Sequence, residues 1–369
     1  DSGDAEAMIQ KIQTGTRKIR QELSQARLIR AVHSERQLQE LMVDFWMNHF
    51  NIFMPKGLDR VYTTGFEENV IRPRVFGSFE DLLMATAKSP AMLFYLDNWI
   101  SSAPAEVMEE RIAQLRNGFD RGSGPGRRGD RGARRQSAMG EEKLQGAARV
   151  LRRAKGLNEN YARELMELHT LGVDGGYSQQ DVIEVARALT GWTFQGPQQG
   201  GNFHFQSFLH EAGDKRVLGH NIPSGGIEEG EQIIRMLAHH PSTARFISSK
   251  LVRRFVADEP PPELVDAASQ TFLRTGGDIR EVLRSIFNHP RFFSPEFHQA
   301  KAKKPLELVA SSLRSVAAEV GPSRQLVNLM ARMGESLYLC QDPTGYPDVA
   351  SAWINTNTLL TRLNFALVL

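Results

Sequence analysis

Residues 34–49, SERQLQELMVDFWMNH, carry the sequence pattern that decides the fold. Ser34 and Gln37 stand in the order of a capping box, in which the two side chains satisfy the first free amides of a helix. The residues that follow repeat at steps of three and four, which is the spacing of one face of an α-helix. These positions are Leu38, Leu41, Met42, Phe45, Trp46 and His49. The stretch predicts a helix that starts close to Ser34 and buries an apolar face.

Helical periodicity extends over most of the chain. A second capping pair, Ser178 with Asp181, precedes an apolar stripe that runs to Leu189. Further helices are predicted at 80–88, 90–98, 141–155, 159–170, 226–239, 242–256, 262–275, 279–288, 305–319 and 354–367.

Three of these helices stop just before a proline, at Pro90, Pro241 and Pro290. The residue before a proline is pushed out of the α region, whereas proline itself suits the first turn of the next helix. Each site therefore predicts a corner between packed helices. His240 and His289 precede two of these prolines, and we interpret them as corner residues in preference to ligands.

Residues 192–222 are the one strand-like zone. Phe203 and Phe205 flank His204 in alternation, and Gly and Pro are frequent between Gly196 and Gly201. The predicted fold class is all-α, with orthogonally packed helices and a small β-hairpin region near 192–222. The length of 369 residues suits one large domain or two closely packed ones, and a single domain over 1–369 is expected.

Residues 117–140 are dominated by Gly, Arg and Ser and hold almost no large apolar side chain. Such a segment cannot bury enough surface to offset its chain entropy, so a disordered insert is predicted. Its arginines leave open a contact with RNA, but a solvated insertion is the favoured interpretation.

The charge balance argues against nucleic acid as the main partner. The chain has 45 Lys and Arg and 43 Asp and Glu, but seven Arg and two Asp lie within residues 116–135. The remainder holds 38 basic and 41 acidic residues, so it lacks a basic footprint. The single cysteine, Cys340, excludes an intramolecular disulfide, and no apolar run reaches the length of a membrane span.

Several uncommon runs resemble a bacterial family catalogued as domain of unknown function 1800. The resemblance covers the chain from about residue 30 to its end and omits the Arg-rich insert. It rests on Phe45-Trp46 with Asn48-His49-Phe50, on Asn158 to Gly172 with Thr190-Gly191-Trp192, on His210 with Gly213, on Lys250-Leu251 with Arg253-Arg254-Phe255, and on Trp353 to Thr356. The resemblance implies a helical protein that is often exported, so a periplasmic or exported location is expected, with the cytoplasm as the alternative. It also implies a gene that neighbours another uncharacterised one, whose product is the expected partner.

The polar side chains of these runs are the candidate site. Glu164 and Glu167 lie three residues apart on one predicted helix, so their carboxylates converge, and His169 follows at the helix end. These three are the predicted ligands of a divalent metal, the expected cofactor. Glu164, Glu167, His49 and His210 are the predicted catalytic residues.

Each candidate also has a structural interpretation. Glu159, Arg163 and Glu167 are spaced for a surface salt-bridge ladder, and His49 extends an apolar stripe as a core histidine would. An EF-hand-like calcium loop around Asp174 is disfavoured, because Thr170 and Gly172 are poor ligands at its first positions.

Two classes of function remain open. The first is a metal-assisted or acid–base hydrolytic enzyme with a pocket between helices 35–50 and 159–170. The second is a non-catalytic binding or assembly protein of the cell envelope that acts with a partner protein. Convergent polar groups in a pocket favour the first, and a broad exposed apolar surface favours the second.

Deletion of residues 117–140, with a short Gly/Ser bridge in their place, should leave the melting temperature within a few degrees of that of the intact chain. Loop closure changes by only about 0.6 kcal/mol per doubling of loop length, and the segment has no core to lose. Thermal unfolding followed by circular dichroism measures this, and a large drop in the melting temperature would mean that the segment is docked.

Overall fold

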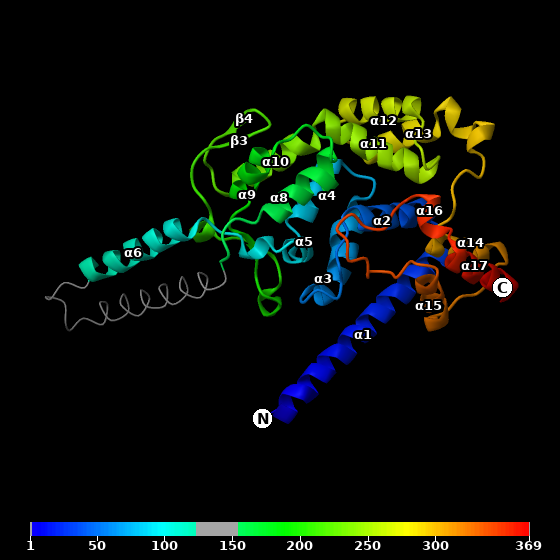
Figure 1. Cartoon of the computed structure of the whole chain (residues 1–369), viewed down its shortest axis with the longest axis horizontal. Coiled ribbons are helices and arrows are strands. Elements are labelled where there is room, and N and C mark those ends of the chain that lie inside the picture. The colour runs from blue at the N-terminus through cyan, green and yellow to red at the C-terminus, as the bar shows by residue number, and fades with distance from the viewer. Residues whose placement is uncertain (1, 123–153, 369) are drawn as a thin grey trace. The chain divides into compact units, whose positions relative to one another are not determined.

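The computed structural model describes residues 2–122 and 154–368, and well over half of these residues are helical. The chain forms two compact units (Figure 1). The first comprises Asp1–Tyr95, Glu164–Gly176 and Ile234–Leu369, and the second comprises Leu96–Arg163 and Tyr177–Ile233. The chain thus passes between the units four times, and neither is a continuous segment. The single large domain stays a prediction. The repeated passage of the chain between the two units is consistent with it.

The predicted fold class is confirmed: the described residues are predominantly helical, with two small antiparallel hairpins. The α-helices described wholly within the first unit are α1 (Ser2–His33), α2 (Gln37–His49), α3 (Asp59–Gly65), α4 (Phe79–Ala87), α5 (Pro90–Tyr95), α11 (Pro241–Phe255), α12 (Pro262–Arg274), α13 (Ile279–Phe287), α14 (Pro305–Ser315), α15 (Arg324–Arg332), α16 (Ala350–Trp353) and α17 (Thr356–Val368). Of these, α11, α12 and α13 pack side by side (Figure 1).

The core of the first unit is aromatic. Trp46, Phe50 and Phe79 are fully buried, and Phe272 of α12 is 1% exposed. The rings of Trp46 and Phe50 stack with their centroids 5.8 Å apart, and those of Phe79 and Phe272 lie 5.7 Å apart. Burying four such rings supplies much of the hydrophobic stabilisation of the unit.

Helix α2 is buried on nearly every side, unlike the one-sided helix that the sequence predicts. It begins at Gln37, and Ser34 accepts a hydrogen bond from the Arg36 amide, so the predicted capping box at Ser34 is wrong by position. Asp44 is buried in its middle, and Leu38 remains 37% exposed. A helix that is buried on nearly every side is a central helix of its unit and not a surface helix.

The corners predicted at prolines are present. Helices α5 and α11 begin at Pro90 and Pro241, and a 3₁₀ helix begins at Pro290. His240 Nδ1 accepts a hydrogen bond from the Ser242 amide at 3.1 Å, and His289 Nδ1 accepts one from the Arg291 amide at 3.2 Å. Both histidines therefore serve as helix caps, as their interpretation as corner residues requires.

The helix predicted over 159–170 changes its geometry partway. It is α-helical as α8 (Glu159–Met166), which passes from the second unit into the first, and continues as a π-helix over Glu167–Leu171. Thr170 Oγ1 donates to the Leu165 carbonyl, five residues earlier, at 2.7 Å. Glu164 and Glu167 thus lie on segments of different periodicity, so three-residue spacing no longer guarantees a shared face.

The second unit holds both hairpins. Strand β1 (Trp192–Phe194) pairs antiparallel with β2 (Phe203–Phe205), and β3 (Lys215–Val217) pairs with β4 (His220–Ile222). Among the described residues, its α-helices are α6 (Ala105–Gly122), the first part of α8, α9 (Gln179–Ala188) and most of α10 (Ile227–Ala238).

Local chemistry explains how this unit is assembled. Ser178 and Asp181 form the predicted capping box at the start of α9. Trp192 is fully buried against Gly230 of α10, where an added Cβ would lie 2.5 Å from the indole ring. Gly230 is therefore needed for the close approach of the helix to the hairpin, in spite of its low helix propensity.

The predicted insert falls mostly outside the described residues. Helix α6 continues to Gly122, so residues 117–122 are helical where disorder was expected. Residues 123–140 lie outside the described part of the chain.

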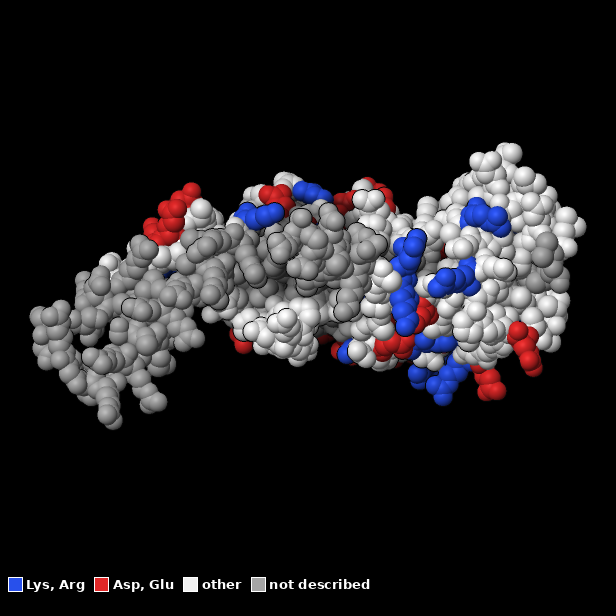
Figure 2. All heavy atoms as spheres, turned by 90° about the horizontal axis from the view of Figure 1, so that it is seen from below, with Lys and Arg blue, Asp and Glu red and all other residues white. Residues whose placement is uncertain are grey.

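None of the described helices is long and apolar enough to span a membrane. On the face drawn in Figure 2, basic and acidic side chains of the described residues are interspersed.

A buried network of charges joins four segments of the first unit. Asp44 of α2 accepts hydrogen bonds from Arg27 of α1 at 2.7 Å, from Arg254 of α11 at 3.2 Å and from Lys304, just before α14, at 2.7 Å. All four residues are less than 9% exposed. Burial favours a neutral carboxyl, but Lys304, Arg27 and Arg254 together hold the pKa of Asp44 well below its usual range.

Further acids adjoin this network. Glu307 lies 2.5 Å from Arg254, and Glu335 lies 3.9 Å from Lys304. Burial raises the pKa of Glu335 despite the opposing charge of Lys304. The ionised Asp44 is therefore the acid that contacts all three buried cations.

Asp44→Asn should destabilise the chain by about 3–5 kcal/mol at pH 7, because Arg27, Arg254 and Lys304 would lose their shared counter-charge. The native pKa of Asp44 lies below its unfolded value of about 4, so its contribution is complete above that pH and is lost as the pH falls further. Urea unfolding at pH 7 and in acid measures both effects.

Asp266→Asn is the matched control, since Asp266 pairs with Arg245 in solvent at 53% exposure. It should change stability by no more than about 1 kcal/mol. If Asp44→Asn costs no more than this control, the network does not organise the unit.

Candidate functional site

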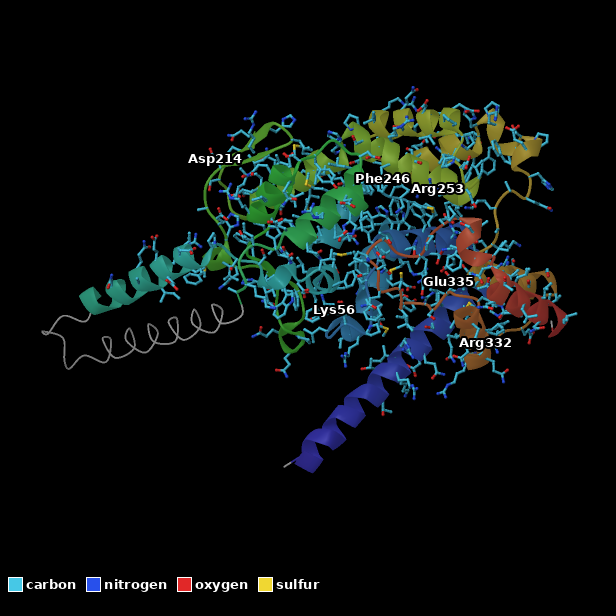
Figure 3. The ribbon with its side chains drawn as sticks, viewed as in Figure 1. Lys56, Asp214, Phe246, Arg253, Arg332 and Glu335 are labelled. Atoms are coloured by element: carbon cyan, nitrogen blue, oxygen red, sulfur yellow. The ribbon has the colours of Figure 1, made fainter. Side chains whose placement is uncertain are left out.

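A cavity of about 240 Å³ lies beside His49 in the first unit. It is lined by side chains of α2, by the last turns of α11 and by the segment 344–349. No residue of 159–170 lines it, so it differs from the pocket that the sequence predicts between helices 35–50 and 159–170. Figure 3 labels Arg253, one of its basic residues, near the end of α11.

His49 and Lys250 meet at this cavity. Lys250 Nζ donates to His49 Nδ1 at 2.9 Å, and His49 Nε2 lies 3.1 Å from the carbonyl oxygen of His169. An ammonium and a carbonyl fix the proton on Nε2, because the first can only donate and the second can only accept. His49 is 2% exposed, and burial, with the charge of Lys250, lowers its pKa well below the usual value. The ring is thus a neutral acceptor that positions the lysine.

Lys250 has few partners of its own. Besides His49, it lies over the Phe246 ring at 5.4 Å from the ring centroid (Figure 3 labels Phe246). Among the described residues, no carboxylate lies within ion-pair distance of it. Burial and the nearby Arg253 lower the pKa of Lys250 to about 8. An appreciable fraction of this amine is therefore neutral near physiological pH.

Arg253 is a second cation of the same kind. It lies three residues after Lys250, so the two project from neighbouring positions of α11. Its Nε donates to the Asp258 carbonyl at 3.0 Å, and no acid of the described residues pairs with it. The other basic groups of the cavity, Arg254 and Lys304, are already neutralised by the Asp44 network.

One acid also lines the cavity. Asp348 lies 3.5 Å from Lys301 and 3.9 Å from Arg254. It forms no ion pair with Lys250, but its charge opposes the lowering of the Lys250 pKa by burial and by Arg253. Two cations that form no ion pair among the described residues therefore face one cavity, which is an arrangement that attracts an anionic group.

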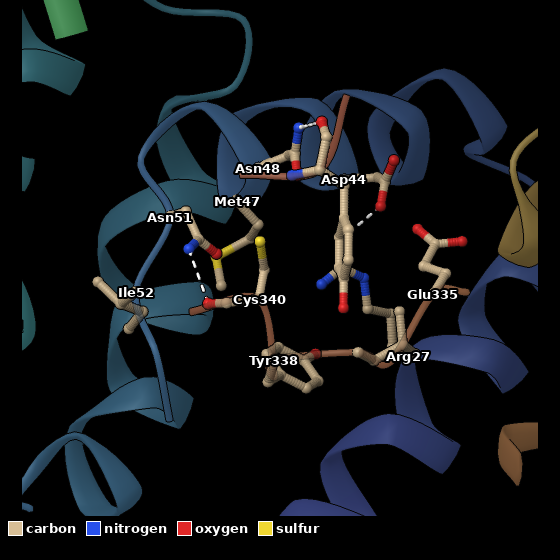
Figure 4. A pocket seen from close by; sticks show the side chains of 11 residues that line it. Arg27, Asp44, Met47, Asn48, Asn51, Ile52, Glu335, Tyr338 and Cys340 are labelled. Atoms are coloured by element: carbon tan, nitrogen blue, oxygen red, sulfur yellow. Dashed lines mark hydrogen bonds and ion pairs between the residues drawn. The ribbon is translucent and has the colours of Figure 1, made fainter. Parts of the chain in front are cut away.

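Two asparagines hold the segment 340–346, part of which lines the cavity. Asn48 lies in α2, and Asn51 follows its end. Asn48 Nδ2 donates to the Tyr346 carbonyl at 2.8 Å, and the Tyr346 amide donates back to Asn48 Oδ1 at 2.7 Å. Asn51 Nδ2 donates to the carbonyls of Cys340 and Asp342. Figure 4 shows these side chains around a smaller cavity of about 30 Å³, which is large enough for a water molecule.

Gly345 permits this close packing. Its φ is +73°, and an added Cβ would lie 2.3 Å from the Asn48 carbonyl oxygen. Only glycine fits such an approach without displacing the segment.

His169, a predicted metal ligand, lies behind His49 and is 2% exposed. The two ring centroids are 6.2 Å apart, and that of Phe50 is 5.1 Å from His169. Burial and then the charge of Lys250 lower the pKa of His169 to about 3, so the ring stays neutral. The structure thus places His49 beside His169, and the link between them is a hydrogen bond from the His49 ring to the backbone carbonyl of His169.

Glu164 and Glu167 are both partly buried. Within the described part of the chain, no three side chains of His, Cys, Asp or Glu come together in a group that could hold a metal ion. The metal site of Glu164, Glu167 and His169 and the catalytic role of the two glutamates stay predictions. The proposed ladder is partly present, since Arg163 lies 3.8 Å from Glu159 in solvent.

His210 belongs to the second unit and has contacts of its own there. Its Nε2 lies 3.2 Å from Glu229 Oε1, and its Nδ1 lies 2.9 Å from the Thr190 carbonyl. Glu229 also pairs with Lys215, and both of these side chains are fully buried. Burial favours a neutral Glu229, but Lys215 and the amides of Gly225 and Gly226 keep its pKa low. Both ring nitrogens of His210 therefore have structural partners, and its catalytic role stays a prediction.

Of the residues that line the cavity, the sequence alone points to His49 but not to the two cations. Lys250 and Arg253 stand out only as part of a run that resembles a family, and the sequence pattern assigns no role to Asp44 of the neighbouring network. A signal exists for Asp44, because it is an acid within the apolar run from Met42 to Met47. Lys250 gives no such signal, since a lysine on a helix is solvated unless tertiary packing encloses it.

Lys250→Met should raise the free energy of unfolding at pH 7, because it removes a partly buried cation next to Arg253. Native Lys250 loses its proton near pH 8, whereas the unfolded side chain does so near 10.5. The unfolded chain binds more protons between these values, so the stability of the unaltered protein rises there. The advantage of Lys250→Met is therefore complete below pH 8 and shrinks towards pH 10.5.

Urea unfolding at pH 7, 9 and 10 measures this trend. Lys18→Met is the control, since Lys18 is 75% exposed in its pair with Glu22 and should show no such trend. A loss of stability in Lys250→Met at pH 7 would identify Lys250 as a structural residue.

Comparison with known proteins gives a family but no function. No curated protein matches the chain, and no solved structure matches it either. The family described as protein of unknown function (DUF1800) matches residues 3–369, which is the whole chain apart from its first two residues. The match includes the runs that carry His49, Lys250 and Arg253. The chain therefore belongs to the DUF1800 family.

Proposed function

We propose that the first unit binds a small anion-bearing molecule in the cavity beside His49, and that Lys250 acts on it as an acid–base group. The observation that carries the proposal is the pair Lys250 and Arg253, two neighbouring cations that face one cavity and form no ion pair among the described residues. The sequence favours a metal-assisted or acid–base hydrolytic enzyme, and this proposal takes the acid–base form. It assigns proton transfer to Lys250 in place of Glu164 and Glu167.

Each group has a distinct task in this proposal. Arg253 binds the anionic group of the ligand, because its guanidinium offers N–H donors in a planar fork. Lys250 has a pKa of about 8, close to the operating pH that favours proton transfer. In its neutral form it takes a proton from a substrate or from a water molecule, and as an ammonium it returns one.

His49 is a positioning residue. Its Nε2 proton is committed to the His169 carbonyl, so only Nδ1 faces the lysine. The π-helix places this carbonyl where it can hold the ring, and local π-helices are often found at functional sites.

Titration calorimetry with inorganic phosphate and with acetate tests the binding part of this proposal. Binding of at least one of these anions is expected, and Lys250→Met and Arg253→Met should each weaken it at least tenfold. Arg245→Met is the matched control on the same helix, because Arg245 pairs with Asp266 in solvent and lies outside the cavity. Equal binding by all three variants, or no binding to the unaltered chain, would contradict the proposal.

Competitive acetylation of lysines across a pH series tests the acid–base part. The half-point of labelling at Lys250, read by mass spectrometry, should lie near pH 8, where an ordinary exposed lysine would give about 10.4. Saturation with the bound anion should move this half-point upward, since an anion stabilises the ammonium. A half-point above pH 10 without anion would remove Lys250 as the acid–base group.

The second candidate, a binding protein that acts with a partner, is favoured by one observation. Helix α17 exposes Leu359, Leu360, Leu363 and Leu367, the last at 85%. An apolar surface of this kind is typical of protein–protein contact. The same calorimetry separates the candidates. A protein that acts only by contact through α17 need not bind phosphate or acetate, and Lys250→Met would then have no binding to weaken.

A further inference from the structure

A second, larger cavity lies in the first unit and has no part in the proposed acid–base chemistry. It measures about 640 Å³ and is bounded chiefly by α2, α14 and the end of α11. Ligand pockets in proteins usually measure about 300–1,000 Å³. The cavity is therefore large enough for an organic molecule.

Part of the wall is apolar. Leu41 of α2, Phe255 of α11, and Leu306 and Ala310 of α14 contribute side chains to it. Leu306 and Ala310 are buried, whereas Leu41 and Phe255 are partly exposed at the cavity. Such a surface favours the apolar body of a ligand, because covering it removes apolar area from water.

The acids of the cavity are already neutralised. Glu40 lies 2.9 Å from Arg72, Glu307 lies 2.5 Å from Arg254, and Asp44 belongs to the buried network. They therefore leave little negative charge to repel an anion or to attract a cation.

Two basic residues of the same cavity have no acid beside them among the described residues. Lys303 Nζ donates to Ser311 Oγ at 2.9 Å, and Arg314 donates to the Val32 carbonyl. Ser311 lies three residues before Arg314 on α14, so both cationic groups occupy the same face of that helix. Both residues are exposed, which places them where a ligand can meet them.

We infer that this cavity binds a free amphipathic monoanion, with its apolar body against Leu41, Phe255, Leu306 and Ala310 and its carboxylate beside Lys303 and Arg314. The charge complementarity selects the anion, and the apolar wall selects a chain or a flat ring system over a small inorganic ion. This inference is independent of the proposed function, since neither Lys250 nor His49 lines the cavity.

Titration calorimetry with sodium octanoate on the full chain tests the inference, and 1-octanol and octylammonium serve as comparison probes of equal chain length. Octanoate should bind at least tenfold more tightly than octanol, and octylammonium should bind most weakly. Lys303→Gln combined with Arg314→Gln should weaken octanoate at least tenfold and leave octanol unchanged. Both side chains are exposed, so this double variant is expected to fold.

Two controls locate the site. Arg332→Gln changes an exposed arginine of α15 that does not line the cavity (Figure 3 labels Arg332) and should leave octanoate binding unchanged. Lys250→Met should also leave it unchanged, even if it abolishes binding of phosphate or acetate. Absence of octanoate binding, equal binding of octanoate and octanol, or loss of binding in Lys250→Met but not in the double variant would each overturn the inference.

Discussion

The ionised carboxylate of Asp44 is the constraint on which the first unit depends. It lies on the central helix α2 and contacts cations from α1, α11 and the start of α14 at 2.7 to 3.2 Å. Removing three cations and one carboxylate from water is costly, and the cost is offset only if the geometry is satisfied on every side. The positions of four segments are thus coupled to one side chain.

The same network shapes both cavities. Arg254 lines the cavity beside His49 and also the larger cavity between α2 and α14. Because Asp44 and Glu307 already neutralise Arg254, it is not the free cation of either cavity. The cations that form no ion pair among the described residues are Lys250 and Arg253 in one cavity and Lys303 and Arg314 in the other. The two proposals therefore depend on different pairs of cations, and neither pair belongs to the Asp44 network.

The π-helix over Glu167–Leu171 connects the fold to the candidate site. It brings the carbonyl of His169 to His49, and this contact fixes the proton of His49 on Nε2. The ring can then only accept a hydrogen bond from Lys250. A regular α-helix would have continued the spacing on which the predicted Glu164–Glu167 pair relied.

The sequence alone determined most of the secondary-structure elements of this protein. Apolar spacing predicts most of the helices, X-Pro steps predict three corners, and alternation with Gly and Pro predicts the hairpins near 192–222. These features depend on residues that are close along the chain, so they can be predicted from the sequence. His49 and His169 were also named from the sequence, although as a catalytic residue and a metal ligand.

Only the tertiary structure decided which polar groups are enclosed and which of them lack partners. Asp44, Lys250 and Lys304 are distant in sequence, and nothing in local spacing shows that packing brings them into one unit. A lysine on a solvated helix has little effect on the free energy of folding. When neighbouring segments exclude water from it, the charged form is destabilised and its pKa falls. The spacing of Glu164 and Glu167 does not by itself place the two side chains on one face, because the backbone changes from an α- to a π-helix between them. The candidate site thus follows from enclosure and charge balance, which are properties of the folded unit and not of any one segment.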